Sequence, residues 1–111
     1  MAFLRACALA DIKDDAALGV TVDGQDVALA RHGDEVLAIE DMCSHASVAL
    51  SEGEVADCQI ECWLHGSMFD LRTGKPTNLP ATEPVATFPV DVRDGDVYVD
   101  VESFLNGVTP Q

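Results

Sequence analysis

Two short motifs in the middle of the chain each combine a cysteine with a histidine. The first is Cys43-x-His45, and the second, after an interval of 16 residues, is Cys62-x-x-His65. Two thiolates and two imidazoles are the ligand set of a [2Fe-2S] centre in which histidines replace cysteines on one of the two irons. Each motif sits in a stretch typical of loops, so two loop tips could close on one inorganic core. The pattern predicts one [2Fe-2S] cluster bound by these two cysteines and two histidines.

The ligand types also indicate what such a centre does. Four thiolates leave a [2Fe-2S] cluster with a negative charge that grows on reduction, which keeps its reduction potential low. Two neutral imidazoles lift that penalty, because two cysteinates against a core of formal charge about +2 give a roughly neutral oxidised cluster. The pattern therefore predicts an electron carrier. The sequence has neither a flavin nor a nicotinamide fingerprint, and we do not expect the chain to be an enzyme in its own right.

Zinc is the alternative metal for the same four residues. Zinc also accepts two cysteines and two histidines, but its usual pairs are Cys-x2-4-Cys and His-x3-5-His, and a Cys-x-His pair with a single spacer is atypical. A catalytic cysteine-histidine pair fits less well, because it does not explain two such pairs. A zinc-stabilised interaction module thus stays open as an alternative function.

Hairpins are predicted on the N-terminal side of the motifs. Residues 20–22 and 25–30 flank Asp23-Gly24, a dipeptide that favours tight hairpin turns. A second turn at 31–34 leads to a third strand over 35–40, which delivers the chain to the first motif.

A further hairpin is predicted on the C-terminal side. Residues 87–92 and 96–101 alternate between apolar and polar side chains around a turn at 93–95. Pro89 indicates an edge or irregular position in the first of these strands, since proline cannot donate to a strand ladder. The only weak helical candidate is 11–18, which is too short to promise more than a turn.

The segment between the hairpins, residues 41–84, is rich in glycine and proline. Short strands are expected at 59–61 and 68–71. The proline-rich stretch 76–84 is interpreted either as a third loop folded over the cluster or as a rigid connector.

The 111 residues are enough for one small domain. We predict a mainly β fold with an antiparallel, sandwich-like or barrel-like base formed by residues 1–40 and 85–111. A cluster-binding subdomain over residues 41–84, with two ligand loops, is inserted into this base. The metal centre is expected to contribute to the stability of so small a fold.

The charge balance bears on partners. With 20 acidic against 6 basic residues, the formal net charge is −14, so nucleic acid and anionic membranes, which would repel the chain, are poor partners and neither is expected. A basic protein partner fits, although the acidity could simply keep the chain monomeric. Residues 1–10 have an arginine inside the apolar stretch and predict no targeting signal, and no span is apolar enough for a membrane. The expected location is the cytoplasm, where cysteines serve metals rather than disulfides.

Three residues with reactive side chains lie outside the two motifs. Cys7 is predicted to be a small buried hydrophobic residue on a strand. Cys58 is interpreted as a loop or strand cysteine, with a spare ligand or a redox-sensitive thiol as alternatives. His32 is predicted to lie at a turn between two strands and is assigned no function.

Longer stretches around the motifs resemble a known family. The stretches Cys43-Ser44-His45, Cys62-Trp63-Leu64-His65-Gly66-Ser67-Met68-Phe69-Asp70 and residues 71–76 and 79–85 are similar to bacterial Rieske-type ferredoxins. The resemblance implies a Rieske fold and a small soluble carrier that takes electrons from a flavoprotein reductase and passes them to a ring-hydroxylating oxygenase. The Cys-Trp-Leu-His-Gly-Ser variant is most similar to actinobacterial ferredoxins associated with SUF iron-sulfur assembly genes, so an assembly protein is the alternative acceptor.

The resemblance also implies roles for single residues. Cys43 and Cys62 would bind one iron, and His45 and His65 the outer iron near the surface. Respiratory Rieske proteins have a disulfide between the loops where this chain has Val48 and Leu64, so that disulfide cannot form here.

Further residues around the cluster follow from the same comparison; they are Trp63, Leu64, Gly66, Ser67 and Phe69. Ser67 matches a serine that donates a hydrogen bond to a cluster sulfur in respiratory proteins, whereas Phe69 replaces a tyrosine hydroxyl. Fewer hydrogen bonds to sulfur stabilise the reduced form less, so we predict a potential near the bottom of the range of about −150 to +300 mV.

Electron transfer is expected at the edge where the two histidines face solvent. Trp63, Leu64 and Met68 are interpreted either as an apolar rim around the imidazoles or as core residues. Acidic residues near the tips are candidates for steering a basic partner; they are Asp41, Glu52, Glu54 and Asp70.

Overall fold

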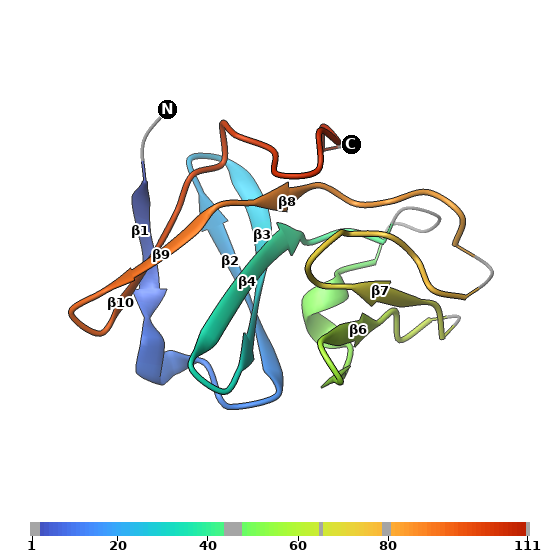
Figure 1. The fold of residues 1–111 in the computed structure, drawn as a ribbon, viewed down its shortest axis with the longest axis horizontal. Helices are drawn as coiled ribbons and strands as arrows, with labels where there is room; N and C mark the ends of the chain where they lie inside the picture. Colours follow the sequence, from blue (N-terminus) through green and yellow to red (C-terminus); the bar gives the residue numbers. More distant parts are fainter. Residues whose placement is uncertain (1–2, 44–47, 65, 79–80, 111) are drawn as a thin grey trace.

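The computed structural model describes residues 3–43, 48–64, 66–78 and 81–110 (Figure 1). His45 and His65 therefore lie outside the described residues, whereas Cys43 and Cys62 lie within them. In the described part of the chain, ten strands form three antiparallel sheets. The mainly β, antiparallel fold predicted from the sequence is confirmed.

The three sheets follow one another across the molecule (Figure 1). The central sheet has the order β2-β3-β4-β8, with the bounds β2 (Ala16–Val22), β3 (Gln25–His32), β4 (Glu35–Glu40) and β8 (Thr87–Phe88). A second sheet has the order β1-β10-β9, with β1 (Leu4–Ala8), β9 (Val90–Arg93) and β10 (Asp96–Val99). The third sheet has the order β5-β6-β7, with β5 (Val55–Ala56), β6 (Gln59–Glu61) and β7 (Met68–Asp70).

Two 3₁₀ helices of three residues each connect these strands, η1 (Leu9–Asp11) and η2 (Leu50–Glu52). Neither of them, nor any other described segment, is a helix long and apolar enough to cross a membrane.

The predicted hairpin turns are present. Asp23 and Gly24 have φ values of 48° and 80°, and Asp94 and Gly95 have φ values of 50° and 78°, as a tight hairpin turn of this kind requires. The strand that enters the first turn is longer than expected, because it begins at Ala16. The weak helical candidate over 11–18 is therefore wrong at its C-terminal end, where β2 pairs with β3 along its whole length.

The central sheet is buried on both faces. In β3, Val27 and Leu29 pack into one hydrophobic core, while Ala28 and Ala30 pack into the other. Alternate side chains of a strand point to opposite faces of its sheet, so the first core lies between the central and second sheets and the second core lies on the side of the third sheet. The core on the side of the third sheet also contains Cys43.

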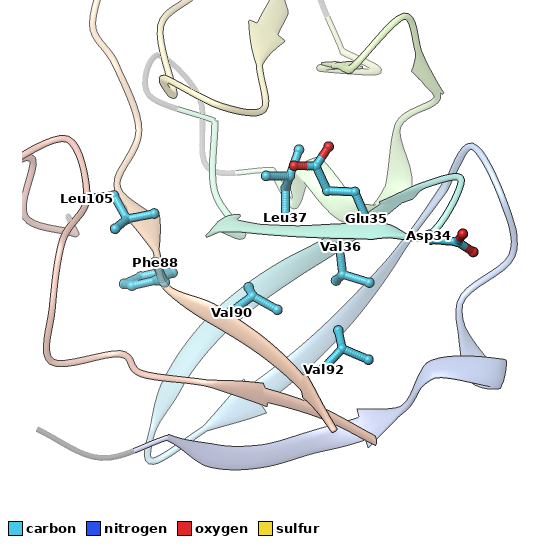
Figure 2. Close-up of a pocket in the computed structure, with 8 residues that line it drawn as sticks. All are labelled: Asp34, Glu35, Val36, Leu37, Phe88, Val90, Val92 and Leu105. Carbon is cyan, nitrogen blue, oxygen red and sulfur yellow. The ribbon is translucent and has the colours of Figure 1, made fainter. Parts of the chain in front are cut away.

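Pro89 marks the point where the chain changes sheets. β8 pairs with β4 through Ala38 and Phe88, and β9 pairs with β10 after the proline, which confirms the predicted irregularity. Because β4 and β9 diverge from this point, an apolar groove of about 340 Å³ opens between them. Val36 points from β4 toward Val90 and Val92 across this groove (Figure 2).

Cys7 is buried on a strand, as predicted, whereas His32, which was predicted to lie at a turn, still belongs to a strand. Cys7 is on β1 and is 7% exposed, and burial raises the pKa of its thiol above the ordinary value. His32 is exposed, is the last residue of β3 and directly precedes the turn to β4; its Nδ1 lies 3.1 Å from a carboxylate oxygen of Asp15.

Candidate metal centre

The first cysteine follows directly from β4. The backbone N–H of Cys43 donates to the carbonyl oxygen of Val48 at 3.0 Å, which closes the loop over residues 44–47 at its base. Asp41, two residues before Cys43, is bonded to η2, because its carboxylate accepts hydrogen bonds from the N–H and the hydroxyl of Ser51, both at 2.7 Å. The Cys43 side chain is buried, with 1% of its surface exposed.

The second cysteine follows β6 in the same way. The N–H of Cys62 donates to the carbonyl oxygen of Ser67 at 2.7 Å, and its carbonyl oxygen accepts from the N–H of Gly66 at 2.8 Å. These two bonds close the loop that contains His65. Cys62 is completely buried, so both cysteines are buried where a backbone hydrogen bond closes a loop, and His45 and His65 follow them in sequence by two and three positions.

One hydrophobic core receives both cysteines. Cys43 and Cys62 belong to the same buried cluster, together with Leu50, Ile60 and Phe69. None of the chain's four cysteines, all of which are described, forms a disulfide. Two buried sulfur donors in one apolar core, each with a histidine in its own loop, are a donor set that fits a [2Fe-2S] cluster with mixed ligands.

The predicted neighbours of the centre divide into buried and exposed residues. Ser67 and Phe69 are completely buried. Trp63 and Leu64 are 50% and 44% exposed, and Gly66 follows at a positive φ of 77°.

Exposed apolar side chains lie next to both cysteines in the sequence. Met42, which sequence analysis did not select, is 38% exposed directly before Cys43; its position next to a ligand was the only signal for it. Met68 is half-buried. We call the three exposed side chains, Met42, Trp63 and Leu64, the apolar rim.

The described part of the proline-rich segment packs against the second cysteine loop. The N–H of Thr77 donates to the carbonyl oxygen of Met68 at 2.7 Å, and the side-chain amide of Asn78 donates to the carbonyl oxygen of Gly66 at 3.2 Å. Further along, the N–H of Ala81 donates to the Ser67 hydroxyl at 3.0 Å. The segment is thus held at three points along the chain that follows Cys62.

Cys58 lies in the turn between β5 and β6. It has a φ of 59°, an unusual value for a residue other than glycine, and Asp57 before it has a φ of 53°. Its side chain is half-buried against the core that contains Cys43. Burial raises the pKa of the Cys58 thiol, and Arg72 nearby lowers it in smaller measure, so the turn position fits the prediction of an ordinary loop cysteine.

Comparison with known proteins identifies the family. A family model for the Rieske [2Fe-2S] domain matches residues 2–89. The chain belongs to the Rieske [2Fe-2S] family. The 3-phenylpropionate/cinnamic acid dioxygenase ferredoxin subunit of Escherichia coli K12 is 42% identical over 99 residues, which are 88% of this chain and 92% of that protein.

Two solved structures have the same fold. The ferredoxin of carbazole 1,9a-dioxygenase from Nocardioides aromaticivorans IC177 has a TM-score of 0.85 and 34% identity, with 100% of both chains covered. A chain in a complex of reduced oxygenase and oxidized ferredoxin in carbazole 1,9a-dioxygenase has a TM-score of 0.81 and 39% identity, covering 87% of this chain and 91% of that one.

The family assignment decides between the alternatives left open by the sequence. The protein carries one Rieske-type [2Fe-2S] cluster and is an electron carrier, which answers the zinc hypothesis. The relatives named above are ferredoxins of dioxygenase systems, and they give no support to the alternative role in SUF iron-sulfur assembly.

Proposed function

We propose that Cys43, His45, Cys62 and His65 bind the cluster, and that the protein is the ferredoxin component of a dioxygenase system. It accepts one electron from a flavoprotein reductase and delivers it to the oxygenase. The observation that carries the proposal is the burial of Cys43 and Cys62 in one core, at the bases of two hydrogen-bonded loops. When bound, the cluster supplies reversible one-electron chemistry.

The proposal divides the chain into two parts. Residues 41–84 form the cluster-binding subdomain, and residues 1–40 and 85–111 form the base that holds it. With a net charge of −14, self-association is disfavoured by repulsion, and we expect a monomer that acts in the cytoplasm.

Partner docking is assigned to the apolar rim. Exposed apolar side chains next to the two cysteines favour a contact with a partner protein that excludes water. Among the four acidic residues near the tips, Asp41 is bonded to Ser51 and Asp70 accepts from the N–H of Arg72 at 2.8 Å. Glu52 and Glu54 are exposed, so these two are the better candidates for steering a basic partner.

A low potential follows from the residues around the sulfur atoms. Ser67 offers a hydroxyl close to Cys62 in sequence and is buried with it, whereas the side chain at position 69 is a phenyl ring. With one hydroxyl donor in place of two, the reduced cluster is stabilised less. We expect a potential near the bottom of the range of about −150 to +300 mV.

Stopped-flow reoxidation of the reduced protein tests the assignment. The chemically reduced protein is mixed with the oxygenase component of a 3-phenylpropionate/cinnamic acid dioxygenase, and the return of the oxidised absorption is followed. We expect a rate that rises with oxygenase concentration, falls as salt is raised, and falls on Trp63→Ala. The exposed base variant Leu105→Ala, which lies on another part of the surface, is the control and should leave the rate unchanged.

A reoxidation rate that does not depend on the oxygenase concentration contradicts the dioxygenase assignment. A rate that depends on the oxygenase but not on Trp63 contradicts the docking surface alone.

A further inference from the structure

The C-terminal tail, residues 100–110, follows the segment that the Rieske family model matches. It is anchored on the base by successive residues. The Phe104 ring packs against Phe88 with 6.0 Å between centroids, and the N–H of Leu105 donates to the carbonyl oxygen of Thr87 at 2.9 Å. Leu105 lies beside Phe88 at one end of the groove (Figure 2). The next residue, Asn106, is therefore held in a fixed place.

The Asn106 side chain makes four hydrogen bonds. Its amide nitrogen donates to the carbonyl oxygens of Thr73 at 2.9 Å and Val85 at 2.8 Å. Its amide oxygen accepts from the N–H groups of Thr87 at 3.3 Å and Val108 at 3.2 Å. A side-chain amide has two donors and one oxygen with two lone pairs, so the whole capacity of Asn106 is used.

Two of these bonds join the ends of one segment. Residues 74–84 begin after Thr73, in the turn that follows β7, and lead to Val85, whose N–H donates to the carbonyl oxygen of Gly74 at 2.9 Å. A Cβ atom at Gly74 would lie 2.2 Å from the Val85 oxygen and 2.8 Å from the Asn106 nitrogen. We call this meeting point, formed by Thr73, Gly74, Val85 and Asn106, the neck.

The segment closed by the neck contacts the loop that follows Cys62. Ala81, inside it, donates its N–H to the hydroxyl of Ser67, and Ser67 lies within the loop that begins at Cys62. Both Ala81 and Ser67 are buried. The short stretch 81–85 therefore connects the neck with the Ser67 hydroxyl.

We propose that Asn106 is a positioning residue for the cluster: by closing the neck it holds Ala81 against Ser67 and so fixes the direction of the Ser67 hydroxyl. This inference rests on the proposed binding of the cluster beside Cys62. It assigns to the tail a part in setting the environment of the metal centre.

Two substitutions separate the neck from the tail. Asn106→Ala removes all four bonds. Asn106→Asp keeps the oxygen that accepts from Thr87 and Val108, but it replaces the two donors by an acceptor that faces the carbonyl oxygens of Thr73 and Val85. Ser103→Ala is the matched control, because its hydroxyl donates only to the Asp100 carboxylate at 3.0 Å, in the same tail.

Hydrogen exchange and redox titration of the oxidised holoprotein provide the test. We expect exchange across residues 75–86 to become roughly tenfold faster in both Asn106 variants, with the tail itself still protected in Asn106→Asp. The midpoint potential should fall in both, since a loosened Ser67 stabilises the reduced state less. Iron content should stay at the wild-type level, and Ser103→Ala should change neither readout.

Unchanged exchange across 75–86 in both Asn106 variants overturns the neck, and faster exchange with an unchanged potential overturns the link to the centre. A wild-type protein without iron contradicts the proposed ligands instead, and the exchange measurement still decides whether the neck exists.

Discussion

The two cores of the molecule differ in how they are held together. The core between the central and second sheets is lined by long ladders, such as the seven paired positions of β2 and β3. The core on the other side is covered by strands of only two or three residues, β5, β6 and β7. Short strands give few ladder hydrogen bonds, so this side depends on loop closures, on close backbone contacts and on the metal centre.

The candidate cysteine ligands belong to the core with the shorter strands. Cys43 and Cys62 lie on the side with the least regular structure, each at the closure of a loop, which is a common arrangement for functional residues. β3 serves both sides at once, with Val27 and Leu29 on one face and the smaller Ala28 and Ala30 on the other.

Removal of the cluster is expected to have the largest effect and to separate the two cores. Metal binding is coupled to folding where the site does not persist without its metal. In protein stripped of iron by a chelator under reducing conditions, we expect exchange across 48–64 and 66–78 to rise on the order of 100-fold, while β3 and β10 keep their protection. Equal loss of protection in both regions would show that the base does not stand alone.

A glycine in the cluster-binding region provides the next largest effect. A Cβ atom at Gly53 would lie 1.6 Å from the carbonyl oxygen of Glu61, directly before Cys62. We expect Gly53→Ala to lower the free energy of unfolding by about 3 kcal/mol and to reduce the iron content. Gly95→Ala, in the open hairpin turn of the base, has no atom near its added methyl group and should cost only about 1 kcal/mol through its positive φ.

Equal costs in urea titrations of the two glycine variants would contradict the close approach of the loop around Gly53 to β6.

Adding a hydroxyl to a buried phenylalanine should change the reduction potential of the cluster only in the core that contains Cys43 and Cys62. Phe69→Tyr adds a hydroxyl at the position where the resemblance to respiratory Rieske proteins implies a tyrosine, and a new hydrogen bond of about 1 kcal/mol to the reduced centre corresponds to a rise of about 40 mV. Phe88→Tyr adds the same group in the other core and should lower stability without moving the potential. Redox titration of both variants checks the pair, and a shift of the same size in both would contradict it.

The smallest effect is expected from the ion pair that joins the two regions. A guanidinium nitrogen of Arg72, in the turn after β7, donates to a carboxylate oxygen of Glu35 in β4 at 2.7 Å, and this bond lowers the pKa of Glu35. A lowered pKa stabilises the fold above the ordinary value near 4.5, and that contribution is lost as the pH falls through the lowered value. Both side chains are largely exposed, so the effect is weak and screened by salt.

Glu35→Gln should therefore cause a slight fall in the melting temperature at pH 7 and low salt, and almost none in high salt or well below pH 4. Thermal melts across pH check this, and a larger loss at acid pH than at neutral pH would contradict the pair.

Sequence patterns predicted the base well because its signals are local. Asp23-Gly24 and the turn ending in Gly95 predict their hairpins, and Pro89 indicates the irregular position where the chain changes sheets. The hairpin between β5 and β6 was not predicted as a turn, because Cys58 occupies a positive-φ position where glycine or asparagine is usual. The start of β2 at Ala16 was missed because two alanines and a leucine show no alternation, and pairing with β3 decides their conformation.

For the centre, the sequence indicates only candidate ligands. The two motifs carry their own spacing, so the sequence alone is enough to propose Cys43 and Cys62. Asn106 carries no such signal, because its partners Thr73 and Val85 are 33 and 21 positions away in the chain. Contacts of that kind depend on the complete fold.

The central claim is that Cys43 and Cys62, and not the other two cysteines, hold the cluster. Its most direct test is the iron and acid-labile sulfide content of four single variants, Cys7→Ala, Cys43→Ala, Cys58→Ala and Cys62→Ala, with exchange protection of β3 as the check on folding. We predict that the variants at 43 and 62 lose both iron and sulfide, while those at 7 and 58 keep the wild-type content and a Rieske-type EPR signal. Full iron and sulfide in a folded variant at 43 or 62, or their loss only in the variant at 58, would contradict the claim.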